Sequence, residues 1–291
     1  LQSSNEGVVS IEDGLLSAIS AGEAELTVKA VKESASIETK LKVAVKELNP
    51  AKTRATYYTE EKRANAQENI SKYGWATDIQ KTAVSGAKMF LEMEDDYLWN
   101  LVPSQMIPRS YAVTAPQTIG CLNCGSKVNE FGNYPYIIDT EKNPWKLTCP
   151  NCKMVFPTND FKAYYEGGLD ENGFFNPDLA KAHNNELIAN GEPGNLVNVL
   201  YPEKGESWGV DDGTGYIAED GQKYTFVAYY NHEGLWHGGI IVKALNALRD
   251  AYLYTGDVAY ANKGVILLDR IADVYPDLDL DIWNYQDGYL N

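Results

Sequence analysis

The sequence lacks any long apolar run. No stretch of its 291 residues approaches the ~20 apolar residues that a membrane-spanning helix needs, and no charged-then-apolar signal peptide opens the chain. The sequence therefore predicts no insertion into a membrane. Because the chain opens directly on Leu1-Gln2-Ser3-Ser4, we expect it to be cut from a longer protein, whose missing part would carry any export signal.

Basic residues are scarce. The chain has 25 Lys and Arg against 41 Asp and Glu, a formal net charge of −16. Nucleic acids and anionic membranes require a basic footprint, so neither is expected as a partner. An anionic substrate would need Arg, Lys or His concentrated locally against this field. With 44% hydrophobic and 23% charged residues, the chain otherwise has the composition of a soluble globular protein, with room for one large domain and a smaller one.

Histidine is scarcer still, with three in the chain. His183 has no evident partner, and we expect it to be a surface or hydrogen-bonded side chain. The other two fall in the segment Tyr229-Tyr230-Asn231-His232-Glu233-Gly234-Leu235-Trp236-His237, just before the clearest amphipathic helix. Groups that bind protons or anions lie here between aromatic residues, which is typical of a carbohydrate site.

The two histidines of this segment do not fit the zinc-protease motif H-E-x-x-H. That motif places them at i and i+4, about one helical turn apart, so that both face one metal. His232 and His237 are at i and i+5, and at about 100° per residue the second ring is turned away around an α-helix. We therefore exclude the protease. Glu233 and His237 are then either sugar contacts or polar neighbours on a solvated face.

Cysteine occurs only as two C-x-x-C pairs, the most specific motif in the chain. Cys121 and Cys124 are separated from Cys149 and Cys152 by residues 125–148, slightly more than in common four-cysteine zinc sites. Four thiolates complete a tetrahedral zinc and leave no open position, so we predict a structural zinc. The alternative is two disulfides, favoured in an exported protein without metal.

Two periodicities divide the chain. Residues 1–48 alternate in strand fashion and form a small β module, 49–56 are a linker, and 57–291 have a helical period. We expect early helices at 60–72, 75–92 and 95–101. Gly256 and Asp257 are expected to end one later helix and begin the next. The helix after the histidine segment is expected to carry Ile241, Leu245, Leu248 and Tyr252 on one stripe. The last helix carries the apolar residues Val265, Leu268, Ile271 and Ala272.

The β module resembles the later half of a bacterial immunoglobulin-like domain of group 2. The resemblance is carried by Gly14-Leu15-Leu16-Ser17-Ala18-Ile19-Ser20-Ala21-Gly22 and the following Glu25-Leu26-Thr27-Val28. About four strands are present where a sandwich has about seven. The resemblance implies a partial spacer on a secreted or cell-surface bacterial protein, with no chemistry of its own.

Residues 57–291 resemble the N-terminal half of heparinase II/III-like polysaccharide lyases. Short motifs in a fixed order carry this resemblance: Arg63-Ala64-Asn65, Tyr73-Gly74-Trp75-Ala76, Leu98-Trp99-Asn100-Leu101-Val102-Pro103, Pro108-Arg109-Ser110, the two cysteine pairs running into Phe156-Pro157-Thr158-Asn159-Asp160-Phe161, Asn231-His232, and Leu268-Asp269-Arg270-Ile271-Ala272-Asp273-Val274-Tyr275-Pro276. It implies a mainly α fold: part of an α/α toroid, with a zinc-ribbon-like insertion at about 118–156. The C-terminal β-sandwich domain of that family is expected in the missing part.

The resemblance also implies an activity, β-elimination on a uronic-acid polysaccharide. In that reaction the uronate carboxylate is neutralised, a base removes the C5 proton, and an acid protonates the departing O4. By position, Asn231 and His232 match the neutralising segment, Tyr285 or Tyr289 the catalytic tyrosine, and Arg109 a contact to the substrate carboxylate. Further sugar contacts are expected from Tyr230, Glu233, Trp236 and His237.

Other interpretations stay open. Asn231 and His232 would serve equally as caps of the following helix. Glu233 paired with Asp211 or Asp212 would instead make a toroid glycoside hydrolase. The turn Asp211-Asp212-Gly213-Thr214-Gly215 has residues that bind calcium but not a full ligand loop. A non-catalytic glycan-binding or scaffold fragment is the third interpretation.

Overall fold

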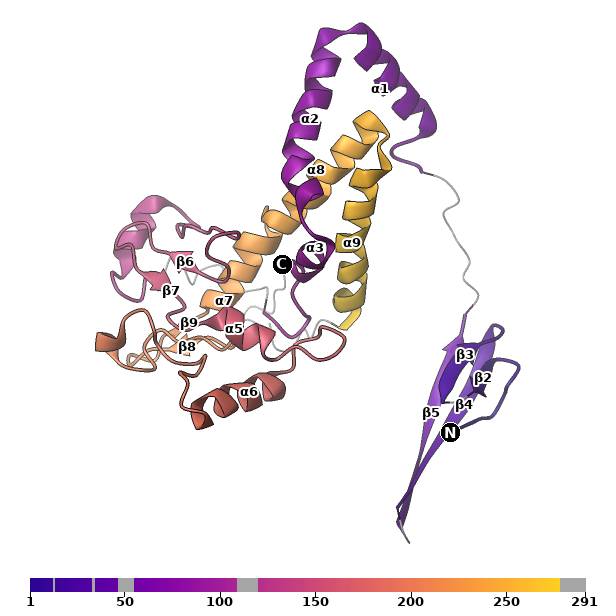
Figure 1. Cartoon of the computed structure of the whole chain (residues 1–291), viewed down its shortest axis with the longest axis horizontal. Helices are drawn as coiled ribbons and strands as arrows, with labels where there is room; N and C mark the ends of the chain where they lie inside the picture. Colours follow the sequence, from indigo (N-terminus) through magenta and orange to yellow (C-terminus); the bar gives the residue numbers. More distant parts are fainter. Residues whose placement is uncertain (13, 33–34, 47–54, 109–119, 278–291) are drawn as a thin grey trace. The chain divides into compact units, whose positions relative to one another are not determined.

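A computed structural model describes residues 1–12, 14–32, 35–46, 55–108 and 120–277 (Figure 1). The fold is mixed: it is 44% helical, with small antiparallel sheets. The chain forms two compact units, Leu1–Lys62 and Arg63–Asn291. Three predicted site residues, Arg109, Tyr285 and Tyr289, lie outside the described residues. Among the helices that are described, none is long and apolar enough to cross a membrane.

The first unit contains two antiparallel sheets. One has the strand order β1-β4-β5, and the other pairs β2 with β3. The long hairpin of β4 and β5 runs in register from Gly22 opposite Val45 to Lys32 opposite Ala35. The strands are β1 Gln2–Ser3, β2 Val9–Glu12, β3 Leu15–Ala18, β4 Gly22–Lys32 and β5 Ala35–Val45.

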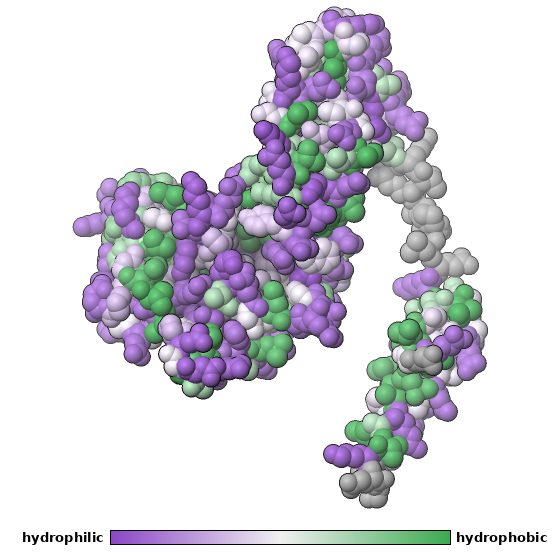
Figure 2. All heavy atoms as spheres, viewed as in Figure 1, coloured by the Kyte–Doolittle hydropathy of each residue, from purple (hydrophilic) through white to green (hydrophobic). Residues whose placement is uncertain are grey.

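The core of this unit is small. Its buried residues are Val8, Val9, Ala24 and Leu26. Ile11, Val43 and Val45 pack partly buried against this core. Several other apolar side chains of the strands are exposed, as the green surface of this unit in Figure 2 shows. Leu15, for example, is 73% exposed. So few buried side chains supply little of the apolar burial that normally stabilises a β-sandwich.

The second unit is built around packed helices. α2 packs on α8, and α8 packs on α9 (Figure 1). The amide of Gln67 in α1 donates to the carbonyl of Tyr254 at 2.7 Å and so ties α1 to the end of α8. The helices are α1 Glu60–Lys72, α2 Gly74–Glu92, α3 Asp95–Asn100, α5 Phe161–Glu166, α6 Pro177–Ala189, α7 Phe226–Tyr229, α8 Ile240–Thr255 and α9 Val258–Val274.

The predicted junction between the last two helices is confirmed. Gly256 adopts φ 74°, the left-handed conformation that ends α8, where a Cβ would be strained. The carboxylate of Asp257 accepts the N–H of Ala259 at 2.9 Å and caps α9. A connection this short makes α8 and α9 an antiparallel pair.

Of the four apolar residues named for α9 from the sequence, only Ile271 packs against the core. Val265 and Leu268 are 59% and 54% exposed, and the buried residues of the helix are Tyr260, Leu267, Arg270 and Val274. Arg270 marks the buried face because its guanidinium lies over the Trp99 and Phe174 rings and donates to the Gly173 carbonyl. The buried face of α9 therefore includes a charged residue, so a pattern of apolar residues does not identify it.

The cysteine segment is a small hairpin. β6 (Leu147–Thr148) pairs with β7 (Val155–Phe156). Ile137 adds an isolated bridge to Thr148. A further hairpin, β8 (Tyr216–Ile217) with β9 (Lys223–Tyr224), leads into α7. Stacked aromatic rings join these parts, among them Phe156 and Phe226 with centroids 4.8 Å apart.

Candidate functional site

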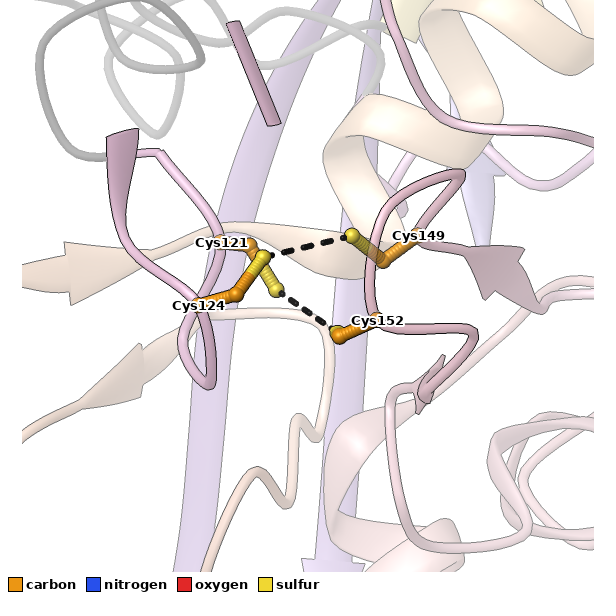
Figure 3. A group of neighbouring side chains, drawn as sticks. All are labelled: Cys121, Cys124, Cys149 and Cys152. Carbon is orange, nitrogen blue, oxygen red and sulfur yellow. Dashed lines mark hydrogen bonds between the residues drawn. The ribbon is translucent and has the colours of Figure 1, made fainter. Parts of the chain in front are cut away.

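The four cysteines lie together at metal-binding distance. Cys121 Sγ is 3.7 Å from Cys152 Sγ, and Cys124 Sγ is 3.7 Å from Cys149 Sγ. Figure 3 shows the four thiols directed toward one another from two separate turns. A tetrahedral ion with bonds of about 2.3 Å would place its sulfur ligands about 3.8 Å apart. The observed separations fit that geometry, so the cluster is compatible with a structural metal.

The two cysteine turns have the same construction. In each, the residue after the second cysteine donates its N–H to the carbonyl of the first: Gly125 to Cys121 at 2.8 Å and Lys153 to Cys149 at 3.0 Å. Both donors adopt positive φ, 59° at Gly125 and 62° at Lys153. This conformation folds the chain back and brings each pair of thiols to one side.

Burial opposes charge on two of these thiols. It raises the pKa of Cys121 far above its ordinary value and also raises that of Cys149. At Cys152 burial is outweighed by hydrogen bonds, one of them from the Met154 N–H, and the pKa is lowered. A cation among the four sulfurs removes this penalty because it neutralises the thiolates where water cannot. With all four positions supplied by the chain, such an ion would have no open position for a substrate.

The segment that contains His232 and leads to His237 is a π-helix, Tyr230–Trp236, between α7 and α8. In a π-helix the backbone hydrogen bond joins residues i and i+5. The N–H of His237 accordingly donates to the His232 carbonyl at 2.6 Å. The centroids of the two imidazole rings are 5.1 Å apart, and the ring planes are inclined to each other at 44°. The expectation that an i, i+5 spacing turns the rings apart is therefore wrong, because it assumed an α-helix.

Glu233 joins the two histidines. Its Oε1 accepts a hydrogen bond from Nδ1 of His232 at 2.8 Å and from Nδ1 of His237 at 3.1 Å. The side chains of His232 and Glu233 are 12% and 14% exposed, whereas that of His237 is 62% exposed. We call these three residues the histidine cluster. It is held by the chain on one side and open to solvent on the other.

Glycines make the end of this π-helix possible. Gly238 adopts φ 70°, a conformation that costs other residues about 1–2 kcal/mol. A Cβ on Gly239 would lie 2.3 Å from the carbonyl oxygen of Gly234. The pair Gly238-Gly239 therefore lets the chain turn sharply after His237 and start α8 at Ile240.

Asn231 has a different environment from its neighbour. It is 1% exposed, and its amide nitrogen donates to the carbonyls of Ile107 at 3.3 Å and Pro108 at 2.8 Å. Neither Asn231 nor His232 caps α8, because Gly239 occupies the N-cap position. In this structure the donors of Asn231 hold the chain immediately before Arg109 rather than point into a cavity.

A cavity of about 390 Å³ adjoins the π-helix. Its aromatic lining comes from Tyr97, Trp145, Tyr165 and Tyr230. A second cavity, of about 250 Å³, contains Glu233 and Lys243 in its wall. Thr140 and Glu141 line both cavities, so the two adjoin.

The predicted sugar contacts do not all face one cavity. Tyr230 lines the aromatic cavity, while Trp236 lines a pocket of about 10 Å³ beside Asn231, too small for a sugar. Trp145, Tyr97 and Tyr165, which sequence reasoning missed, come from three separate segments. No spacing in the sequence would have grouped them.

Asp211 is a structural carboxylate. It is fully buried, and its oxygens accept the N–H groups of Gly213 and Gly215 at 2.8 Å and of Val227 at 3.0 Å. Burial raises its pKa to about 6, against the opposing effect of these amides. Because backbone amides occupy both oxygens, Asp211 is unsuited to bind calcium or to act on a substrate.

Comparison with models of protein families, with curated proteins and with solved structures finds no match to this chain.

Proposed function

We propose that this chain is part of a polysaccharide lyase that cleaves a uronic-acid-containing polysaccharide by β-elimination. The observation that carries the proposal is that Glu233, which holds His232, lines the smaller of two adjoining cavities, the larger of which has an aromatic lining. Aromatic faces bind the apolar faces of sugars, and an imidazole held by a carboxylate is a usual proton-transfer group. The order of the sequence motifs, which resembles that of heparinase II/III-like polysaccharide lyases, supports the same activity.

The residues take distinct roles in this proposal. Glu233 fixes the ring of His232, which removes the C5 proton as general base. Asn231 is a positioning residue, because its amide donors hold the Ile107 and Pro108 carbonyls. The residue after Pro108, Arg109, is predicted from the sequence as a contact to the substrate carboxylate. In this proposal it takes the neutralising role that the sequence assigned to Asn231 and His232. Tyr285 or Tyr289 is the candidate acid for O4.

The finer fold belongs to the same proposal. The antiparallel pair α8 and α9, with α2 packed on α8, supports part of an α/α toroid, because such toroids are built from helical hairpins. The hairpin of β6 and β7 with its two cysteine turns supports a zinc ribbon. Zinc is the proposed ion, since four thiolates at this separation are its usual structural ligands.

The first unit is proposed to be a partial immunoglobulin-like spacer. Its two small sheets and few buried residues support a fragment rather than a whole sandwich. A spacer of this kind agrees with a secreted or cell-surface bacterial enzyme whose further β-sandwich domain lies outside this chain.

Among the alternatives, a glycan-binding fragment has specific support and the hydrolase has less. The aromatic cavity would bind a sugar with or without catalysis. A hydrolase needs a second carboxylate beside Glu233. Of the two predicted partners, Asp211 is closed off by backbone amides, and Asp212 does not line the cavity that contains Glu233.

The test is ultraviolet absorbance during incubation with a panel of uronate polysaccharides. Elimination leaves an absorbing C4–C5 double bond, so the full-length protein that contains this chain should produce a rise. His232→Ala should abolish the rise, Asn231→Ala should lower it, and His183→Ala is the matched control that should retain it. New reducing ends without absorbance would instead establish a hydrolase. Binding of a polysaccharide with neither product would establish a glycan-binding protein.

A further inference from the structure

We infer that His232, Glu233 and His237 form a binding site for a divalent first-row transition metal, separate from the four cysteines. The site shares His232 and Glu233 with the proposed lyase site, but its evidence does not rest on that activity. Two imidazoles and one carboxylate are a common three-residue ligand set for zinc and for related ions such as iron(II). Their ligand atoms all lie within 4.8 Å of one another.

The distances need little adjustment. An ion with bonds of about 2.1 Å holds neighbouring ligand atoms about 3.4 Å apart in a tetrahedron. Nδ1 of His232 and Nδ1 of His237 lie 2.8 and 3.1 Å from the same oxygen of Glu233. Small side-chain rotations would widen these separations to the spacing of metal ligands. Each imidazole would then carry its proton on Nε2, which leaves Nδ1 free to bind the ion.

The backbone preorganises the three ligands. The π-helical hydrogen bond from His237 to the His232 carbonyl fixes the two histidines one turn apart. Gly238 and Gly239 end the helix at that point. A ligand set fixed by the chain loses less conformational freedom when the ion binds.

The burial of the ligands indicates an open metal site. His232 and Glu233 are largely enclosed, while His237 is 62% exposed. Three protein ligands leave a coordination position for water or for an oxygen of a ligand. The cavity beside Glu233 gives such a ligand access, and Lys243 in its wall favours an anionic one, such as a carboxylate. The net charge of −16 also favours capture of a cation.

Metal content after equilibration with zinc tests the inference. The 291-residue chain is incubated with excess Zn²⁺, separated from free ion, and its zinc measured per mole of protein. We expect two equivalents, one on the cysteines and one on the histidine cluster. His237→Ala and Glu233→Gln should each bind one, and His183→Ala, a histidine outside the cluster, should bind two. The retained equivalent shows that the variants are folded.

Cobalt(II) identifies the ligands of the second ion. Co²⁺ on four thiolates gives intense sulfur-to-metal charge-transfer absorption. A second equivalent on nitrogen and oxygen ligands should add only weak d–d bands, which His237→Ala should remove. One equivalent in the unaltered chain, or a second that survives both His237→Ala and Glu233→Gln, would overturn the inference.

Failure of the metal site and failure of the lyase proposal are distinguishable. If the protein forms a product that absorbs in the ultraviolet but binds only one zinc, the lyase proposal is supported and the second metal site is contradicted. If it binds two zinc equivalents but forms no product, the second metal site is supported and the lyase proposal is contradicted. An imidazole nitrogen that binds a metal cannot accept a proton. Removal of the second ion should therefore raise activity if His232 is the base.

Discussion

Among the described residues, two clusters of side chains that could bind a metal ion differ in construction. The four cysteines come from two turns far apart in sequence, are half-buried or buried, and supply every position of a tetrahedron. The histidine cluster comes from six consecutive residues, is partly exposed, and supplies three positions. A closed set of ligands suits a structural ion, and an open set suits an ion that meets a second ligand.

The difference also concerns what each cluster does for stability. The cysteine turns face the main core, which includes Cys121 and Cys149, so an ion there would hold two chain segments together. The three ligands of the histidine cluster share one helical turn that backbone hydrogen bonds already form. Loss of a ligand should therefore affect folding strongly at the first cluster and only weakly at the second.

The largest effect is expected from Cys149→Ser. Loss of one thiolate should lower the free energy of unfolding on the order of 5 kcal/mol, a fraction of the ~10 kcal/mol or more that zinc supplies to small metal-folded domains. Urea denaturation with and without a chelator measures this. The chelator should destabilise the unaltered chain and have little further effect on the variant. Equal stability of the two proteins in the presence of zinc would contradict a structural role.

Asp211 extends the comparison to a closed site around a carboxylate. Its pKa is raised by burial to about 6 from an ordinary 3.8. Between these two pH values the carboxyl is protonated in the folded state but ionised in the unfolded state. The stability gained from this protonation is fully present below about pH 4 and is lost as the pH rises through 6. The full change is on the order of 3 kcal/mol.

The measurement compares the unaltered chain with Asp211→Asn between pH 7 and 4. Because the variant cannot titrate at this position, the stability of the unaltered chain relative to the variant should increase as the pH falls. A difference that stays constant over this range would show that the three amide hydrogen bonds keep the carboxylate ionised in the folded state.

Gly239→Ala tests whether the π-helix builds the histidine cluster. The added methyl would overlap the Gly234 carbonyl, and the displaced backbone should cost about 2 kcal/mol. Binding of the second metal equivalent should weaken with it. Gly238→Ala is the matched control. A Cβ at this position meets open space, but the residue has a positive φ, which costs an alanine about 1 kcal/mol. If both variants bind the second ion equally well, the close contact at Gly239 does not set the cluster.

The sequence predicts the first cluster well and the second poorly for a physical reason. A C-x-x-C pair encodes its own turn, so that four thiols could be grouped from spacing alone. The i, i+5 spacing of His232 and His237 has no meaning until the type of helix is known, and an α-helix is the default assumption. The signal that was present is Gly238-Gly239, which ends the helix directly after His237.

The same limit applies to the fold. Capping residues such as Asp257 are local, and the junction of α8 and α9 could be predicted from them. The buried face of α9 could not, because Arg270 is accommodated by the Trp99 and Phe174 rings, a contact made only in the folded chain. The aromatic cavity has the same origin, since Trp145 and Tyr230 come together only through tertiary packing.

The smallest effect on stability is expected from His237→Ala without metal. The side chain is 62% exposed, so its removal should change the free energy of unfolding by less than about 0.5 kcal/mol. Adding Zn²⁺ at 100 times its dissociation constant should stabilise the unaltered chain by about 2.7 kcal/mol beyond the contribution of the cysteine site. The variant should lack this additional stabilisation, because the two ligands that remain are too few to hold the ion. Equal stabilisation of both proteins by zinc would show that the second ion binds elsewhere. A large loss of stability in the variant without zinc would show that His237 contributes to folding, as is expected of Cys149 at the other cluster.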